Sequence, residues 1–164
     1  MKRNYSLALS VILAAATIAG AQVKVSGTSR CGKPDAQHMV EVGDAPNHSF
    51  SISQGKCAWT KPFDIDGVQN KEGLDTSFSE STGNRARVRG FFLDTMANGD
   101  KGHYRYEATG TLKDGMFQTA EAKWTLAGGT GKLKGAKGKG TCKGKGESDG
   151  TVNWECEGEL VLAK

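Results

Sequence analysis

The strongest constraint on the fold is a hairpin predicted near the C-terminal end of the sequence. Two extended segments, 137–145 and 151–162, flank the tripeptide SDG at 148–150. A three-residue hairpin loop favours a type I turn followed by a glycine in the left-handed region. Gly150 stands at that position, so the sequence predicts a tight antiparallel turn there.

This turn fixes the pairing register of the two segments. It places Glu147 opposite Thr151 and then pairs residues whose numbers have a constant sum. Cys142 comes to lie directly opposite Cys156. The register therefore predicts a cross-strand disulfide between these two cysteines.

The same register sorts the side chains of the hairpin onto two faces. On one face, Gly138, Gly140, Gly144 and Gly146 lie opposite Leu160, Gly158, Trp154 and Val152, and the cysteines share this face. On the other, Lys139, Thr141, Lys143 and Lys145 lie opposite Glu159, Glu157, Glu155 and Asn153. We expect the glycine face to be interior, where the glycines leave room for Trp154 and for sheet curvature. The lysines then belong to a charge-paired exterior that sets the register, because a one-residue slip would bury them.

Short β-rich segments recur along the rest of the chain. They are 38–42, 48–52, 57–65, 74–81, 86–95, 103–112 and 117–126, and the turn signals NGDKG, KDG and SDG separate several of them. Strands joined this tightly favour antiparallel pairing in a meander. The sequence thus predicts an all-β domain, either a closed barrel or a sandwich.

The basic stretch 128–146 contains eight glycines and six lysines, but its detail does not suit phosphate or nucleic acid. A P-loop needs Ser or Thr after its GK step, whereas Gly131 and Lys132 are followed by Leu133. Nucleic-acid binding favours unpaired basic residues with aromatic residues on the same face. Glutamates face most of these lysines, so we expect no nucleic-acid partner.

The N-terminus has the pattern of a signal peptide. Lys2 and Arg3 precede the apolar run LALSVILAAATIAG, and AGA at 19–21 is a small-x-small cleavage signal before Gln22. The alternative, a membrane anchor, is disfavoured because the run is short and no charged stop follows it.

The predicted organisation is a signal peptide at 1–21 and one β-barrel domain at 22–164, with the mature protein secreted or periplasmic. Removing Lys2 and Arg3 lowers the formal charge from +4 to +2, so the overall charge does not favour a polyanionic partner. We expect no stable membrane insertion of the mature chain.

Four cysteines in an exported chain predict two disulfides. If Cys142 pairs with Cys156, then Cys31 pairs with Cys57 by elimination and ties an irregular N-terminal segment to the strand that begins at Cys57. A four-thiolate metal site is disfavoured because no CxxC pair is present. The sequence predicts no metal and no cofactor.

The histidines His38, His48 and His103 could join Asp44 or Glu41 in a metal site. They lack HxH and HxxxH spacing, so we interpret them as surface residues. A GxSxG nucleophile motif is also absent, and a hydrolase has no support.

Tyr104 and Tyr106 share one face of the segment 103–112 and are the candidate ligand-binding residues. If that face points inward, the interior is apolar with two hydroxyls, which suits a small aromatic or lipid-like ligand. The alternative is that the tyrosines fill a small core, since eight-stranded barrels are barely wider than their side chains. The pairs Trp59 with Phe63 and Trp124 with Leu126 are interpreted as core.

The segment WTLAGGTGKLKGAKGKGT at 124–141 resembles a signature of the dirigent and allene-oxide-cyclase-like β-barrels, here as a secreted member of bacterial type. The matching residues are Gly128, Gly129, Thr130, Gly131, Lys132, Gly135, Ala136, Lys137 and Gly138. The resemblance implies a single antiparallel meander barrel of about eight strands, calycin-like, with a central cavity. It also implies small apolar ligands and, as in plant members, a homo-oligomer. The GGTG turn is expected to be structural, and catalytic residues are not carried over.

Three hypotheses follow. The first is an exported barrel that binds a small apolar or aromatic molecule or has a structural role in the envelope. The second is an isomerase or cyclase of the allene-oxide-cyclase or dirigent type. The third is a protein-interaction module that uses its charged exterior. The sequence leans against an enzyme without deciding the question.

Overall fold

The structure is a computed structural model that describes residues 21–163. The predicted signal peptide lies outside the described residues except for its last residue, Ala21. In chain order the elements are β1 (Gln22–Cys31), β2 (Ala36–Glu41), β3 (Ser49–Lys61), β4 (Asp64–Ile65), β5 (Val68–Thr82), β6 (Arg85–Met96), β7 (Lys101–Lys113), β8 (Met116–Gly129), the 3₁₀ turn η1 (Gly131–Leu133), β9 (Lys137–Gly146) and β10 (Val152–Val161). Within residues 21–163, no helix has the length and apolar character needed to cross a membrane.

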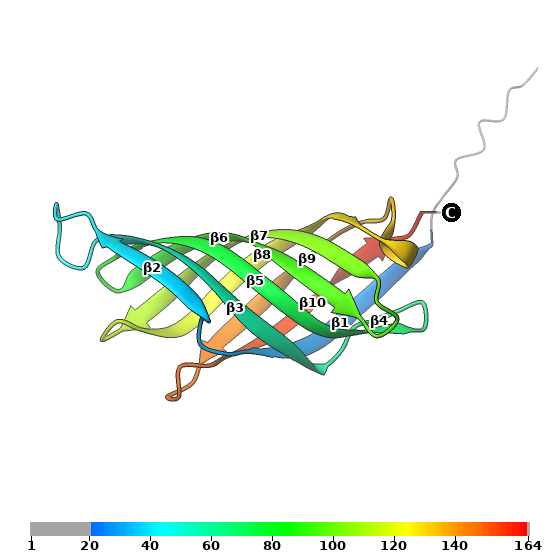
Figure 1. The fold of residues 1–164 in the computed structure, drawn as a ribbon, viewed down its shortest axis with the longest axis horizontal. Coiled ribbons are helices and arrows are strands. Elements are labelled where there is room, and N and C mark those ends of the chain that lie inside the picture. Colours follow the sequence, from blue (N-terminus) through cyan, green and yellow to red (C-terminus); the bar gives the residue numbers. More distant parts are fainter. Residues whose placement is uncertain (1–20, 164) are drawn as a thin grey trace, which may run out of the picture.

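Eight of the strands close into an antiparallel barrel (Figure 1). β3, β5, β6, β7, β8, β9 and β10 pair in sequence, and β1 closes the ring between β10 and β3. β2 and β4 pair with β3 and β5 and stand outside this ring. The predicted eight-stranded meander barrel is confirmed, and the sandwich alternative is wrong.

The N-terminal part of the domain differs from the prediction. Residues 22–31, for which no strand was predicted, form β1, and the separate segments 48–52 and 57–65 are largely one strand, β3, followed by the short β4. β1 alternates between buried and exposed positions along its length. Its later inward residues are the small Gly27 and Ser29, which made the alternation hard to recognise.

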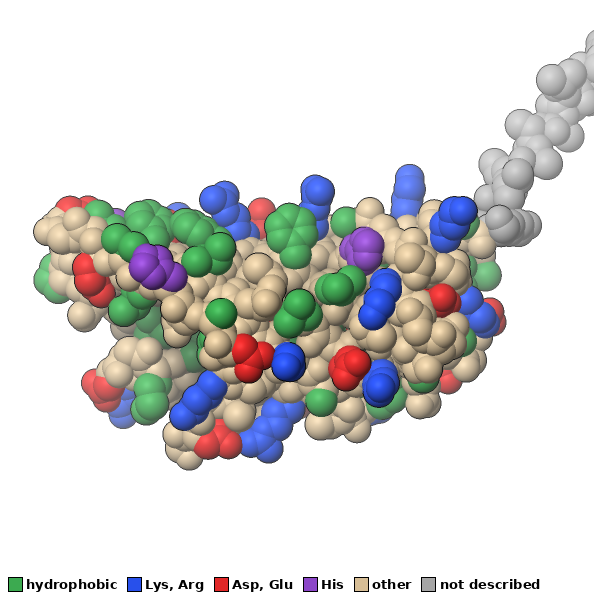
Figure 2. Space-filling model, viewed as in Figure 1, with side chains coloured by type: hydrophobic (Ala, Val, Ile, Leu, Met, Phe, Trp, Pro, Cys, Tyr) green, Lys and Arg blue, Asp and Glu red, His purple; other side chains and the backbone are tan. Residues whose placement is uncertain are grey.

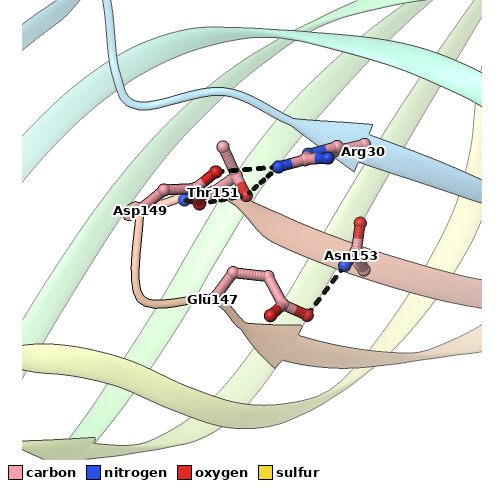
Figure 3. Close-up of polar contacts among 5 residues, drawn as sticks. All are labelled: Arg30, Glu147, Asp149, Thr151 and Asn153. Carbon is pink, nitrogen blue, oxygen red and sulfur yellow. Dashed lines mark hydrogen bonds and ion pairs between the residues drawn. The ribbon is translucent and has the colours of Figure 1, made fainter.

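The C-terminal hairpin has the predicted register. Cys142 lies opposite Cys156, and the pairing extends along both strands. At the turn, Gly150 has φ +80° and its N–H donates to the Glu147 carbonyl over 2.9 Å. Asp149 accepts from the backbone N–H of Thr151, and Arg30 on β1 donates to the Asp149 carboxylate over 2.8 Å (Figure 3). The turn is therefore stabilised both by its own backbone hydrogen bond and by the Arg30 side chain of β1.

Both predicted disulfides are present. Cys142–Cys156 joins β9 to β10, and Cys31–Cys57 joins β1 to β3. Each links residues that lie directly opposite each other in the sheet. The two disulfides therefore lie on either side of the β1–β10 pairing that closes the barrel.

The faces of the hairpin are also as predicted. Lys139 and Lys143 are exposed, and Lys139 forms an ion pair of 3.5 Å with Glu159. Gly144 is buried, and a Cβ there would lie 2.7 Å from the Trp154 ring. The glycines therefore make room for indole rings, and the lysine ladder covers the outside.

Large apolar side chains plug one end of the barrel. The fully buried Leu133 of η1 packs there with Ile65, Met96 and Leu160. The GGTG segment positions this plug, because Thr130 exchanges two 2.8 Å hydrogen bonds with the backbone of Lys101. The expected structural role of the GGTG turn agrees with this geometry.

Serines line the inner wall toward the other end. Ser51 and Ser53 on β3 lie opposite Ser79 and Ser77 on β5, and the hydroxyls of each pair are hydrogen-bonded at 2.7 and 3.0 Å. One end of the interior is thus closed by large apolar side chains, and the other end is lined by small polar side chains. The candidate site lies between these two regions.

Candidate functional site

The barrel encloses a cavity of about 120 Å³. Seven aromatic rings line it, those of Trp59, Phe63, Phe92, Tyr104, Tyr106, Trp124 and Trp154. The remaining lining residues are the four cysteines, Ser29, Ala122 and Asp75. A cavity of this size matches the space of one benzene-sized ring.

The cavity exists because several of its rings lie flat against the barrel wall. Trp124 pairs directly with Gly140, and Tyr106 with Gly90. A Cβ on Gly90 would lie 2.6 Å from the Tyr106 ring, and one on Gly140 would overlap Trp124. Each ring therefore occupies the space over a glycine of the neighbouring strand, and the centre of the barrel stays open.

One carboxyl group faces the cavity directly. The Tyr106 hydroxyl on β7 donates a 2.8 Å hydrogen bond to Asp75 Oδ1 on β5. Burial raises the pKa of Asp75 to about 6, although hydrogen bonds from Tyr106 and Ser77 oppose the rise. Burial, and then the Asp75 charge, raise the pKa of the Tyr106 hydroxyl, which stays protonated.

A second carboxyl group, that of Asp94 on β6, is fully buried beside the cavity. Trp59 Nε1 donates to Asp94 Oδ1 over 2.9 Å, and the Asn70 amide donates to Oδ2. Burial raises the pKa of Asp94 to about 7 despite these hydrogen bonds. The network fixes the Trp59 ring that forms part of the cavity wall.

Tyr104 presents a polar atom without a protein partner. Its side chain is 6% exposed, and its hydroxyl is one of the buried polar atoms that make no hydrogen bond within residues 21–163. Its ring packs edge-on against Trp124, with ring centroids 5.5 Å apart. Burial, and then the Asp94 charge, raise the pKa of this hydroxyl. Because the hydroxyl oxygen itself is inaccessible, Tyr104 lines the cavity through its ring.

The structure brings the predicted residues together. Tyr104 and Tyr106 both point inward and line the cavity, as the alternation of their segment predicted. Their role in ligand binding stays a prediction. Trp59 and Phe63, interpreted as core, pack together at 4.6 Å between ring centroids and also line the cavity. The tyrosines and the core rings therefore do not fill the interior.

Sequence reasoning missed Asp75 and Asp94. Asp94 stands between Phe92 and Met96 on the inward face of β6, so the period-2 pattern carried a signal for it. Asp75 shares its inward face with serines such as Ser77, and that polar face resembles an exterior one. Neither aspartate belongs to a recognisable motif.

The three histidines lie apart, and His48 is half-buried, so its interpretation as a surface residue is wrong. His48 Nδ1 lies 2.5 Å from Asp44 Oδ1, and its Nε2 lies 3.3 Å from Glu80 Oε1. The hydrogen bond to Asp44 raises the pKa of His48 above its usual value. His38 and His103 are exposed, and residues 21–163 contain no group of three or more potential ligands that could hold a metal ion.

The outer surface carries apolar side chains among its charges. Figure 2 shows hydrophobic side chains gathered over the β2 end and scattered along the middle of one face. Ile52 is 55% exposed and Phe91 is 60% exposed. The Arg89 guanidinium lies over the Phe78 ring, 5.0 Å from its centroid, so a cationic side chain covers part of this apolar surface.

The eight-stranded barrel is a dirigent-like fold. One solved structure that matches over the whole length is that of a pterocarpan synthase dirigent protein, with 13% sequence identity and a TM-score of 0.53. The match covers 98% of this chain and 99% of that chain. No protein-family model and no curated protein matches the sequence.

Proposed function

We propose that this protein is an exported barrel that binds a small, mainly apolar and aromatic molecule in its central cavity. The observation that carries the proposal is the cavity, ringed by seven aromatic side chains and lined by one carboxyl group, that of Asp75. Apolar pockets with a few convergent polar groups are the usual form of small-molecule sites.

Export rests on the signal-peptide pattern at 1–21 and on the two disulfides, which persist in oxidising compartments. We further propose that the chain is a distant member of the dirigent and allene-oxide-cyclase-like barrels. The resemblance of the segment 124–141 and the barrel shared with a pterocarpan synthase dirigent protein support this assignment.

The second candidate is an isomerase or cyclase that works by proton transfer. A specific observation favours it, because Asp75 lines the cavity and has its pKa raised to about 6. A carboxyl group with such a pKa can exchange a proton near neutral pH. In this reading Asp75 is the acid–base group and Tyr106 holds it in place through their hydrogen bond. Asp75→Asn would abolish turnover while leaving the binding of neutral ligands intact.

Fluorescence can test the binding proposal, because all three tryptophans of the chain line the cavity. Titration with benzyl alcohol and larger aromatic alcohols should change the emission saturably. Ala122→Leu should weaken binding at least about tenfold, because the added atoms occupy part of a cavity of about 120 Å³.

The matched control is Ala127→Leu, the same substitution at an exposed position of the same strand. It should bind like the wild type. Equal binding by the two variants would place the ligand outside the barrel, and no saturable change with any ligand would contradict the proposed function.

A further inference from the structure

The ionisable groups in the cavity wall are unbalanced in charge. Asp75 is the one carboxylate that lines the cavity, and no lysine, arginine or histidine of the described chain lines it. The side chains that hydrogen-bond Asp75, Tyr106 and Ser77, are both neutral. An ionised carboxylate in such a setting is stabilised strongly by a cation, and this chain provides none there.

The rest of the wall also suits a cation. The indole rings of Trp59, Trp124 and Trp154 and the phenol rings of Tyr104 and Tyr106 surround the cavity. Aromatic faces attract ammonium groups through their quadrupole, and tryptophan does so best. Cages of aromatic rings are a general way to hold organic ammonium ions.

We infer that the ligand is a small aromatic or apolar amine, bound as its ammonium ion with the charge against the Asp75 carboxylate. This inference rests on the proposed function and names the class of molecule that the cavity binds. The ammonium group supplies hydrogen-bond donors, and the Asp75 carboxylate that lines the cavity can accept them. An anion would be repelled by Asp75, and a neutral ligand would gain no charge–charge attraction.

The affinity for an amine should depend on pH in a defined direction. Burial raises the pKa of Asp75 to about 6, so its carboxylate is increasingly protonated below that pH. The titratable groups that face Asp75 inside the barrel are Tyr106 and Tyr104 on β7, which stay protonated, and Asp94 on β6, which is buried beside the cavity. The lysines and arginines of β3 and β6, the strands that pair with β5, are on the outer face. A cation needs the ionised form of Asp75, so its affinity falls as pH drops through 6 and its binding near pH 6 releases a proton.

The test compares three ligands of nearly equal shape: benzylamine, benzyl alcohol and benzoate. Calorimetric titration of the whole protein at pH 7.5 should give an affinity at least about tenfold higher for benzylamine than for benzyl alcohol, with benzoate weakest. At pH 5 the benzylamine affinity should fall about tenfold, whereas that of benzyl alcohol stays constant.

Two variants test whether Asp75 supplies the negative charge that binds the amine. Asp75→Asn should lower the ratio of the benzylamine affinity to the benzyl alcohol affinity from at least about tenfold to about one. Asp114→Asn, at an exposed turn, is the matched control and should change neither affinity. If Asp75→Asn does not fold, the three-ligand comparison on the wild type still decides.

The outcomes separate this inference from the proposed function. Equal affinity for amine and alcohol, or an amine affinity that is unchanged at pH 5, would overturn the cation inference and leave the binding function standing. A failure of all three ligands to bind would overturn both.

Discussion

The replacement of Asp94 by asparagine tests the buried network that fixes one side of the cavity. Asp94 is fully buried, and its pKa is raised from 3.8 to about 7. Between these values the folded protein holds a proton that the unfolded chain has lost. The free energy of unfolding therefore falls as pH rises from about 4 to about 7. A difference of about 3 pH units corresponds to a loss of up to about 4 kcal/mol.

The Asp94→Asn variant would carry no such dependence, because an amide does not titrate in this range. At pH 4 the protonated carboxyl and the amide each offer one acceptor, which receives the Trp59 N–H, and at least one donor. That donor finds an acceptor when the Asn70 amide rotates to present its Oδ1, which has no hydrogen-bond partner among the described residues. The variant should then lie within about 1 kcal/mol of the wild type. As pH rises to 8, the variant should gain stability relative to the wild type by up to about 4 kcal/mol.

The assay is urea unfolding followed by tryptophan fluorescence at pH 4, 5, 6, 7 and 8 for the wild type and for Asp94→Asn. Asp114→Asn, an exposed turn residue, controls for the loss of a negative charge. The buried Asp75 titrates in all three proteins, so its contribution cancels from the differences. Parallel stability curves for the wild type and Asp94→Asn would refute the claim that Asp94 is buried with a raised pKa.

Two further predictions concern the wall of the barrel. Gly90→Ala places a Cβ against the Tyr106 ring and should cost about 1–3 kcal/mol, whereas Gly128→Ala, with nothing within 4 Å of its Cβ, should cost less than about 1 kcal/mol. Equal melting temperatures for the two variants would contradict the ring-over-glycine packing. Joint replacement of Cys142 and Cys156 by alanine should lower the free energy of unfolding by about 2–4 kcal/mol in urea titrations, and peptide mapping without reduction should find these two cysteines linked in the wild type.

The C-terminal hairpin was predictable because its determinants are local. The SDG turn fixes the first pair, and regular pairing then carries the register along both strands. The alternation of Gly138 and Lys139 marks the inner and outer faces. Nothing beyond some twenty-five neighbouring residues is needed to place Cys142 opposite Cys156.

β1 was not predicted because its inward residues are small. Val23 and Val25 begin a clear alternation, but Gly27 and Ser29 continue it with residues that are typical of turns. A Cβ on Gly27 would overlap the Lys61 carbonyl of β3. The need for a glycine at position 27 thus comes from a strand some thirty residues away, and the local sequence does not reveal it.

The site was predicted only in part, for a related reason. The inward direction of Tyr104 and Tyr106 follows from the period of their own strand. Asp75 contacts Tyr106 across strands β5 and β7, which are not adjacent in the barrel. Such a contact depends on closure of the whole ring, and polar residues in an alternating strand are ordinarily assigned to the outside.

Native mass spectrometry of the protein purified without added ligand shows whether the barrel carries a bound molecule. A ligand-binding barrel should give a reproducible added mass on the folded protein, lost on denaturation and reduced in Ala122→Leu but not in Ala127→Leu. A bare protein mass in every sample, with no uptake of benzyl alcohol or benzylamine when either is added, would show that the barrel interior does not serve as a binding site.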